Sequence, residues 1–339
     1  MHVSKLLLSI AVPALLSACY TPEKAMEAIR KLPVETIRYS DSETHARGIA
    51  GQGNKVFLAN ADGQIYELNT QTLAHRKLDT PKLAELRDMY VSADGTTLAA
   101  MQSSDSSHLV FFGPDTLIVA TPPGNPVFLD GMDILRSGVG FLMGDPVDGH
   151  FSLFSTEDHG KSWQSLPNAP ISMPGEAGYA ASGTNVQCIS EEIFVFVSGG
   201  MKNRFFRSED SGNTWEFSDL PYPAKEGSGP FSVCFEDEWN GVIVGGDYTQ
   251  PEKSEGTSYY TTDGGTTWIA SEVPTLGYRS CVTVINDIYY ACGTTGVDFS
   301  TDRGKTWHKW LSNNAFAMQF IRGAIYITTT HSSVLRIKF

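Results

Sequence analysis

Hydrophobic residues in this chain come in short runs separated by turn-forming residues. Typical runs are FSVCF at 231–235, GVIVGG at 241–246 and TSYYTT at 257–262. Apolar runs of this length, rich in β-branched and aromatic residues and bounded by Gly, Asp, Asn or Pro, predict buried β-strands rather than helices. We therefore expect an all-β protein.

The runs recur with a regular period. Strands that follow a loop begin seven units within residues 34–339, which gives about 44 residues per unit, the length of a four-stranded propeller blade. The sequence thus predicts a seven-bladed β-propeller of four-stranded antiparallel blades, although six or eight blades also fit, because the first two units are less regular. The units start at ARGIA (46–50), LRDMYV (86–91), FLDGMDI (128–134), TNVQCI (184–189), FSVCF (231–235), YRSCVTV (278–284) and FAMQF (316–320).

The seventh unit is one strand short of a full blade. It contains only FAMQF, AIYITT and SVLRIKF. The segment VETIRYS at 34–40 is a predicted strand without a unit of its own. We expect this N-terminal strand to complete the last blade and close the ring, because closure removes an exposed sheet edge.

Four polar octets of one pattern lie between the apolar runs. Each reads Ser/Thr-x-Asp-x-Gly-x-Ser/Thr-Trp, in which Asp can accept forward hydrogen bonds from backbone N–H groups and Gly can take a positive φ. The pattern resembles the Asp-box of bacterial neuraminidase-type repeats. The resemblance implies a turn between the third and fourth strands of a blade, tied by the Asp and packed by the Trp. The structural residues so implied are Asp158, Trp163, Asp210, Trp215, Asp263, Trp268, Asp302 and Trp307.

The N-terminal segment MHVSKLLLSIAVPALLSAC has the features of an export signal. Lys5 supplies a positive charge, and the apolar stretch after it is too short for a stable bilayer span. LSAC at 16–19 resembles the lipobox of bacterial lipoproteins, which implies cleavage before Cys19 and a lipid on its thiol. A plain secretory signal is the alternative.

The chain therefore divides into three expected parts: a signal peptide at 1–18, a lipidated Cys and tether at 19–33, and the propeller at 34–339. Several acyl chains together would give stable anchoring. By the family rule, Tyr20 after the lipidated Cys favours the outer membrane in a host that has one, with the protein facing the periplasm. In any other host we expect an extracytoplasmic membrane surface. We expect a monomeric domain in the cell envelope that contacts the membrane through its lipid only.

The charge of the chain restricts its partners. Its 339 residues carry a formal net charge of −13, which argues against binding to nucleic acid or electrostatic binding to anionic lipid. The sequence has no Gly-rich dinucleotide fingerprint, no Cys/His spacing typical of zinc and no complete calcium loop. We expect neither a cofactor nor a metal.

Longer segments indicate a particular family. In order, the chain contains RGIA, LRDMYV, FLDGMDI, GDPVDGHFSLFSTEDHGKSW, GEAGYAASGT, FFRSEDSGNTW, GGDY, GYRS and GTTGVDFSTDRGKTW. Together these segments resemble the bacterial relatives of the photosystem II stability/assembly factor family. The resemblance covers nearly all of the chain after the signal. It implies a seven-bladed propeller that assists the assembly or stability of an envelope complex.

The long loops of the predicted propeller fall on one face. In up-and-down blades, the loops between blades share a face with the loops between strands two and three, and the octets lie on the opposite face. The irregular segments 144–150, 167–183, 219–230 and 246–256 all belong to the first set. Long loops on a rigid scaffold commonly carry binding sites, so we expect the site there. The alternative is that these loops only cap the channel.

Charged and aromatic residues gather at the predicted mouth of the channel on this face. Arginine in an acidic protein can bind a carboxylate or phosphate through its forked donors. We predict that a protein partner or a small anionic ligand binds there, unless the Arg and Asp side chains satisfy one another and the loop backbone. The candidate residues are Arg47, Arg87, Asp88, Asp145, Glu176, Asp247, Tyr248, Tyr278 and Arg279, with Asp130 beside them.

The same residue types allow an enzymatic alternative. Sialidases use an Arg cluster, a Tyr paired with a Glu, and an acidic Asp, and here Tyr248 or Tyr278, Glu176 and Asp145 match those types. Those enzymes have six blades, however, and the Arg-Ile-Pro segment typical of them is absent. Glycoside hydrolysis also needs two carboxylates at a defined separation. A glycoside hydrolase is therefore the second hypothesis.

Two cysteines are placed symmetrically in one predicted hairpin. Cys281 and Cys292 flank the sequence VTVINDIYYA around Asn286 and Asp287. In a two-residue hairpin they would face each other across the strands at a distance close to the disulfide range. A disulfide is possible there in an oxidising compartment.

Overall fold

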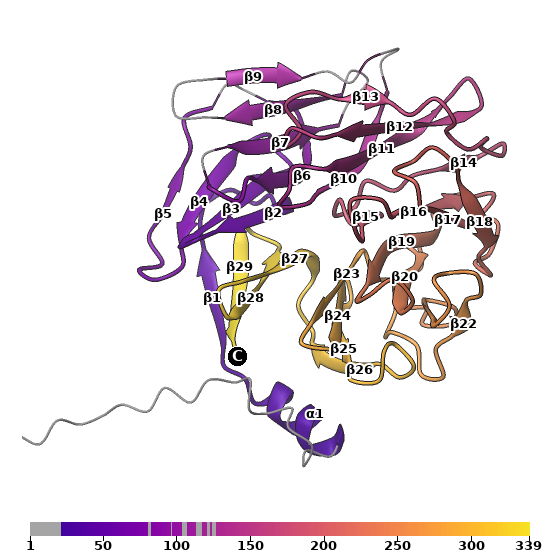
Figure 1. Ribbon diagram of the computed structural model, residues 1–339. Helices are drawn as coiled ribbons and strands as arrows, with labels where there is room; N and C mark the ends of the chain where they lie inside the picture. The colour runs from indigo at the N-terminus through magenta and orange to yellow at the C-terminus, as the bar shows by residue number, and fades with distance from the viewer. Residues whose placement is uncertain are drawn as a thin grey trace, which may run out of the picture.

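The structure is a computed structural model that describes residues 22–80, 83–95, 97–103, 107–112, 117–120, 123 and 127–339. Its strands form seven antiparallel sheets around one axis, so the chain folds as a seven-bladed β-propeller (Figure 1). The predicted fold class and blade count are confirmed. The predicted signal peptide and the predicted lipidation site, Cys19, lie outside the described residues.

The first three blades follow one another along the chain. Blade 1 consists of β2 (Ala46–Gln52), β3 (Lys55–Asn60), β4 (Ile65–Asn69) and β5 (His75–Lys77). Blade 2 consists of β6 (Leu86–Val91), β7 (Leu98–Gln102), β8 (His108–Phe112) and β9 (Leu117–Ala120). Blade 3 consists of β10 (Leu129–Ile134), β11 (Gly140–Val147), β12 (His150–Thr156) and β13 (Gln164–Ser165).

The next three blades continue the same order. Blade 4 consists of β14 (Glu176–Ala177), β15 (Val186–Cys188), β16 (Phe194–Gly200), β17 (Arg204–Ser208) and β18 (Glu216–Asp219), and both β14 and β15 pair with β16. Blade 5 consists of β19 (Ser228–Phe235), β20 (Gly241–Asp247), β21 (Ser258–Thr261) and β22 (Ile269–Ala270). Blade 6 consists of β23 (Cys281–Ile285), β24 (Ile288–Gly293), β25 (Gly296–Ser300) and β26 (His308–Leu311).

Blade 7 joins the two ends of the chain. It consists of β27 (Ala315–Ile321), β28 (Ala324–Thr329), β29 (Ser333–Lys338) and the N-terminal β1 (Val34–Arg38). β1 pairs antiparallel with β29, with Val34 opposite Ile337 and Arg38 opposite Ser333. The predicted closure by an N-terminal strand is confirmed.

The four octets fold into the same turn, between strands three and four of blades 3 to 6. In each, the hydroxyl of the first residue donates to the Asp carboxylate at 2.7–2.8 Å. The same carboxylate accepts the backbone N–H of the Ser or Thr four residues after the Asp, at 2.7–3.0 Å. It also accepts the hydroxyl of that residue, at 2.6–2.7 Å. The Asp therefore closes the turn with three charge-assisted hydrogen bonds.

The octets also join neighbouring blades. The ring of Trp268 in blade 5 lies 5.1 Å from that of Phe205 in blade 4, and Trp307 of blade 6 packs in a buried cluster with Val242 and Tyr260 of blade 5. Gly265 has a φ of 90°, and a Cβ there would lie 2.2 Å from the Phe205 ring. Glycine is required because its backbone touches the preceding blade in a left-handed conformation.

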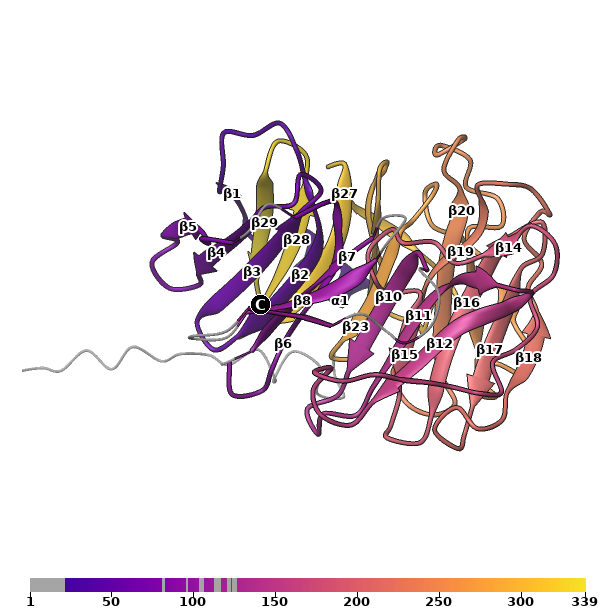
Figure 2. The same cartoon turned by 90° about the horizontal axis from the view of Figure 1, so that it is seen from above.

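The strand order separates the two faces of the ring, which Figure 2 shows from its edge. The octets and the turns between strands one and two lie on one face, here called the octet face. The connections between blades and between strands two and three lie on the other, here called the long-loop face. The predicted separation of octets from long loops is thus confirmed.

The helix α1 (Pro22–Arg30) packs on the outside of blades 6 and 7 (Figure 1). Ile29 is buried in a cluster with Tyr290 and Ile325, and the indole Nε1 of Trp310 donates to the Ile29 carbonyl at 3.1 Å. Phe339, which packs on the same cluster, donates its backbone N–H to Gly323 in the turn between β27 and β28. The helix therefore bridges the outer surfaces of blades 6 and 7. None of the helices in the described ranges is long and apolar enough to cross a membrane.

The hairpin that carries the two cysteines forms as expected. Asn286 and Asp287 both have positive φ, and Cys281 lies opposite Cys292 in the β23–β24 register. Both are free, fully buried thiols. The prediction that Cys281 and Cys292 face each other across the hairpin is confirmed. The disulfide between them is not formed in this structure.

Candidate binding site at the mouth of the channel

Bulges in the innermost strands turn four side chains towards the channel on the long-loop face. The pairing register of β2, β6, β19 and β27 with the next strand shifts near the start of each strand. The residues at these shifts are Arg47, Arg87, Phe231 and Phe316, and all four line one pocket. A bulge adds a residue to one strand and so redirects its side chain. The bulges thus supply both the charges and part of the aromatic surface of the site.

The pocket, here called the mouth, has a volume of about 330 Å³. Its lining combines two guanidinium groups with five aromatic rings. The lining residues are Arg47, Arg87, Tyr179, Ala180, Ala181, Phe231, Tyr248, Tyr278, Ser280, Thr294 and Phe316.

The floor of the mouth is the segment 178–183, which enters the channel from blade 4. The Arg47 Nη1 donates to the Ala181 carbonyl at 3.2 Å, and the Arg87 Nη1 donates to the Ala180 carbonyl at 2.9 Å. The Ser182 hydroxyl donates to the Ser280 carbonyl of blade 6 at 2.7 Å. The segment therefore contacts blades 1, 2 and 6. The loop 167–183 caps the channel, as the alternative prediction stated, and the same loop also forms the base of the pocket.

The two arginines keep unused donors and a net positive charge. Glu85 lies 2.8 Å from Arg87 Nη2 and 3.7 Å from Arg47 Nε, so one carboxylate faces two guanidinium groups. The buried Nε atoms of both arginines have no hydrogen-bond partner among the described residues. Burial, followed by the charge of Arg87, lowers the pKa of Arg47. The excess positive charge and the partial exposure of both guanidinium groups in the pocket favour a bound anion.

One wall of the mouth is aromatic. The rings of Tyr179 and Phe231 stack at 4.0 Å, and Tyr278 meets Phe231 edge-on at 4.7 Å. Tyr248 approaches Phe231 edge-on at 6.4 Å and is 54% exposed. In blade 7, Phe316 stacks on His45 at 3.8 Å. A partly exposed aromatic wall beside two arginines is a surface of the kind that anchors a polypeptide partner.

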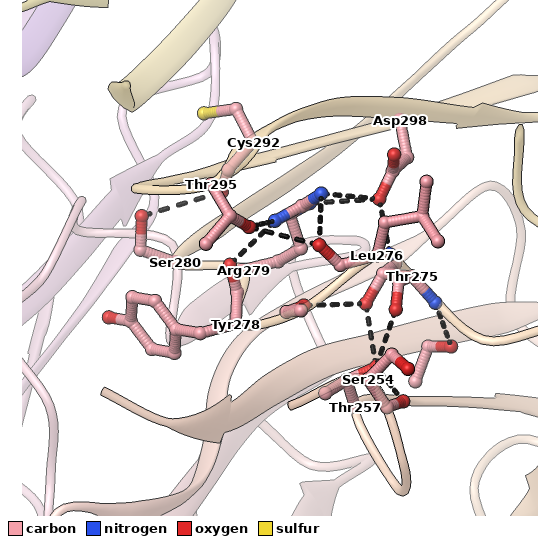
Figure 3. Close-up of polar contacts among 12 residues, drawn as sticks. Ser254, Thr257, Thr275, Leu276, Tyr278, Arg279, Ser280, Cys292, Thr295 and Asp298 are labelled. Atoms are coloured by element: carbon pink, nitrogen blue, oxygen red, sulfur yellow. Dashed lines mark hydrogen bonds and ion pairs between the residues drawn. The ribbon is translucent and has the colours of Figure 1, made fainter. Parts of the chain in front are cut away.

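Arg279 was predicted at the site and has a different role. Its side chain is 1% exposed and forms an ion pair with Asp298 at 2.7 Å (Figure 3). Its remaining donors bind the Tyr278 carbonyl, the Thr295 hydroxyl and the Leu276 carbonyl at 2.5–3.1 Å. All five guanidinium N–H groups are thus satisfied within blade 6, and no donor is left for a ligand.

Glu176 and Asp145 also lie away from the pocket lining. Glu176 is buried and accepts the Nε and Nη2 of Arg204 in a bidentate pair at 2.8 and 2.5 Å, together with the Ser198 hydroxyl. Asp145 accepts the Gly178 N–H at 3.2 Å, and burial raises its pKa. These two carboxylates hold the base of the loop 167–183 in place.

The remaining predicted carboxylates are structural as well. Asp88 accepts the backbone N–H groups of Met89 and Met132 at 2.7 and 3.0 Å, and burial raises its pKa to about 8. Asp130 is 1% exposed, and burial, followed by the charge of Asp145, raises its pKa well above the usual value. Asp247, the last residue of β20, accepts a hydrogen bond from the Lys225 ammonium group at 2.6 Å.

The structure therefore brings together Arg47, Arg87, Tyr248 and Tyr278, and the other six predicted residues, Asp130 included, do not line the pocket. The sequence reasoning missed Tyr179, Phe231 and Phe316. Phe231 and Phe316 occupy the bulge positions that Arg47 and Arg87 occupy in their strands. Aligning the unit starts residue by residue would have found them.

Comparisons with known proteins agree on the architecture. Similar solved structures include virginiamycin B lyase from Staphylococcus aureus, with 14% identity, a TM-score of 0.66, and coverage of 91% of this chain and 100% of that chain. They include YCF48 bound to D1 peptide, with 14% identity, a TM-score of 0.61, and coverage of 91% and 97%. The WD40 β-propeller domain of Doa1 matches at 10% identity with a TM-score of 0.63, over 91% and 97%. The shared feature is the propeller fold.

No protein-family model and no curated protein matches the chain. At these identities the similar structures show the fold alone. They include a lyase as well as a propeller with a bound peptide, so the fold does not decide between catalysis and binding. Among the described residues, no group of three or more His, Cys, Asp or Glu side chains could hold a metal ion.

Proposed function

We propose that this protein is a non-catalytic binding propeller whose mouth holds an anionic group of a protein partner. The observation that carries the proposal is the pair of partly exposed arginines, Arg47 and Arg87, which share one carboxylate and line the pocket beside an aromatic wall. A bound carboxylate or phosphate would balance the remaining positive charge and could accept hydrogen bonds from exposed guanidinium donors. The propeller YCF48 has been solved with a bound peptide, which supports a polypeptide as the ligand.

The geometry does not favour glycoside hydrolysis. None of the residues that line the mouth is an Asp or a Glu. Glu176 and Asp145, the carboxylates proposed for that chemistry, bind Arg204 and the Gly178 N–H instead. Hydrolysis by a carboxylate pair requires both groups to reach the substrate.

The proposal includes a membrane tether at Cys19 and, by resemblance, a role in the assembly or stability of an envelope complex. Cys19 precedes Pro22, the first residue of α1, by three positions. Three residues span at most about 11 Å. Because α1 packs on the outside of blades 6 and 7 and none of its residues lines the mouth, a lipid at Cys19 would anchor the chain without occupying the mouth.

Photocross-linking at the mouth tests the proposal. A photoreactive phenylalanine analogue replaces Tyr248, which lines the mouth, in the full-length protein in its native cells. Trp239 serves as the matched control, because it is 57% exposed in the turn between β19 and β20 on the octet face. We expect a discrete protein adduct from position 248 that is lost when Arg47→Ala and Arg87→Ala are combined.

Two results would contradict the proposal. One is an adduct that forms from position 239 and not from 248. The other is an adduct from 248 that persists in the double arginine variant. The circular dichroism spectrum of the variant confirms that loss of the adduct reflects the site and not unfolding.

A further inference from the structure

Four large apolar side chains lie exposed around blade 4, in the connection from blade 3, in the β16–β17 turn and in β18. Ile171, Met173, Met201 and Phe217 have exposed fractions of 65%, 49%, 53% and 61%. They are referred to here as the apolar patch. None of them lines the mouth. Grouped exposed apolar residues of this size commonly mark an interaction surface.

A buried ion pair organises the apolar patch from beneath. The Arg204 Nη2 donates to the Ile171 carbonyl at 2.8 Å, and the Arg204 guanidinium lies 5.0 Å from the centre of the Phe217 ring. Its partner Glu176 accepts the Met173 N–H at 2.8 Å. The side chains of the pair are 6% and 0% exposed. The patch is therefore held in place before any ligand binds, which reduces the entropy cost of binding.

The apolar patch continues into the mouth along one segment of chain. Residues 171–181 begin at the patch with Ile171 and Met173 and end in the floor of the mouth. The Met201 N–H donates to the Gly175 carbonyl in the middle of this segment at 2.9 Å. The Tyr179 ring lies so close to Gly199 that a Cβ there would be 2.3 Å from it. The segment and the β16–β17 hairpin thus form a continuous surface between the two features.

We propose that the mouth and the apolar patch together bind one extended polypeptide segment, with a carboxylate in the mouth and apolar side chains on the patch. This inference rests on the proposed function of the mouth. The mouth and the patch are connected by about ten residues of this protein, which extend over at most about 35 Å. A peptide of similar length can therefore reach from the mouth to the patch, whereas a small ligand fills only the mouth. Extended peptides commonly bind through pockets for separate side chains along one surface.

A peptide fits this surface better than a membrane does. Adsorption to a bilayer commonly combines apolar insertion with cationic side chains, and Lys202 beside the patch is already paired with Asp219 at 2.7 Å. The whole chain carries a net charge of −13. The partner is therefore a protein segment with an acidic or C-terminal carboxylate and apolar residues at some distance from it.

Selection from a displayed library of random peptides, each about twelve residues long with a free C-terminus, tests this inference on the full chain. We expect enriched peptides to share a carboxylate and, separated from it, two or more large apolar residues. Binding of a labelled selected peptide is then measured by fluorescence anisotropy. We expect Ile171→Ser and Met201→Ser each to raise the Kd about tenfold, as for exposed anchor residues at interfaces.

Trp239→Ser is the matched control, because it removes an equally exposed apolar side chain on the octet face. We expect it to leave the Kd unchanged. Equal urea midpoints for all three variants show that the patch substitutions do not act through unfolding.

The outcomes separate this inference from the proposed function. Enriched peptides that share a carboxylate but no apolar preference, or a Kd that Ile171→Ser and Met201→Ser do not change, would overturn the role of the patch and leave the mouth in place. Failure to enrich any peptide would count against the proposed function itself. Flotation of the lipid-free chain with phosphatidylethanolamine–phosphatidylglycerol vesicles that is lost in the patch variants would assign the patch to the membrane instead.

Discussion

At the scale of single residues, two arginines at similar positions within their blades have different roles, one in binding and one in stability. Arg47 and Arg279 both lie near the start of an innermost strand on the long-loop face. Arg279 has all five donors satisfied inside blade 6 and is 1% exposed. Arg47 keeps an unpaired Nε and lines the mouth. The difference decides which of them can bind a ligand.

Substitution of these residues should separate stability from binding. We expect Arg279→Ala to lower the free energy of unfolding by about 3–5 kcal/mol, because Asp298 is left buried without its counter-charge. Arg47→Ala should cost about 1 kcal/mol or less, since its guanidinium is partly exposed and faces a carboxylate shared with Arg87. Urea unfolding followed by tryptophan fluorescence measures both changes.

A second variant identifies the cause of the loss. Arg279→Met combined with Asp298→Leu removes both charges, and we expect it to recover most of the lost stability. A loss that persists in the double variant would show that Arg279 acts through something other than charge compensation.

The sequence could predict which residue types gather at the mouth, but not which of these side chains are free to bind a ligand. Loop lengths and the octets indicated the correct face, and Arg47, Arg87, Tyr248 and Tyr278 do meet there. Whether an arginine is free depends on partners far along the chain. Asp298 follows Arg279 by nineteen positions in a strand that is not its neighbour, and Glu176 precedes Arg204 by twenty-eight. Sequence patterns with periods of two to four residues contain no information on such pairs.

At the scale of elements, the octet is the unit that repeats most faithfully. Although burial alone would raise the pKa of Asp302, the hydroxyl and N–H of Thr306 hold it below its usual value. The adjacent Trp307 is 2% exposed against blade 5. The fold could be predicted because the turn chemistry is local and occurs four times. The additional strand β14 could not, since it arises from the contact of a two-residue segment with the end of β16.

Loss of one octet carboxylate should therefore destabilise the protein. We expect Asp302→Ala to lower the free energy of unfolding by about 1–3 kcal/mol, because it removes three charge-assisted hydrogen bonds that tie the turn. Thermal unfolding by calorimetry measures the change. Asp79→Ala, at an exposed loop position, is the control and should change stability by about 0.5 kcal/mol or less. Equal effects of the two substitutions would show that the octet carboxylate does not hold the turn.

At the scale of the whole molecule, the interior of the ring contains carboxyl groups, among them Asp88 and Asp130, whose pKa is raised by burial. Asp88 of blade 2 accepts the Met132 N–H of blade 3 and touches Gly183, which enters from blade 4. Burial raises its pKa to about 8, far above the value near 4 of an unfolded chain. Several blades thus meet around a group that prefers to be neutral.

This arrangement predicts that the contribution of Asp88 to stability falls as the pH rises. Between about pH 4 and pH 8 the folded protein retains a proton on Asp88 that the unfolded chain releases, so the contribution of Asp88 is complete below pH 4 and lost by pH 8. We expect the difference in unfolding free energy between Asp88→Asn and the unsubstituted protein to shift by more than about 1 kcal/mol in favour of the variant across this range. Urea titrations at several pH values measure it. A difference that stays constant with pH would mean that Asp88 does not titrate in this window.

The pairing of β1 with β29 has a consequence for the order in which the molecule forms. Residues 34–38 meet residues 333–337, so the contact that completes the ring joins positions almost three hundred residues apart. Such a contact has a high entropic cost of loop closure and cannot exist until nearly all of the chain has been synthesised. β1 is therefore among the last strands to pair, although it precedes the other described strands in the chain. Until β29 has been synthesised, the ring of blades remains open.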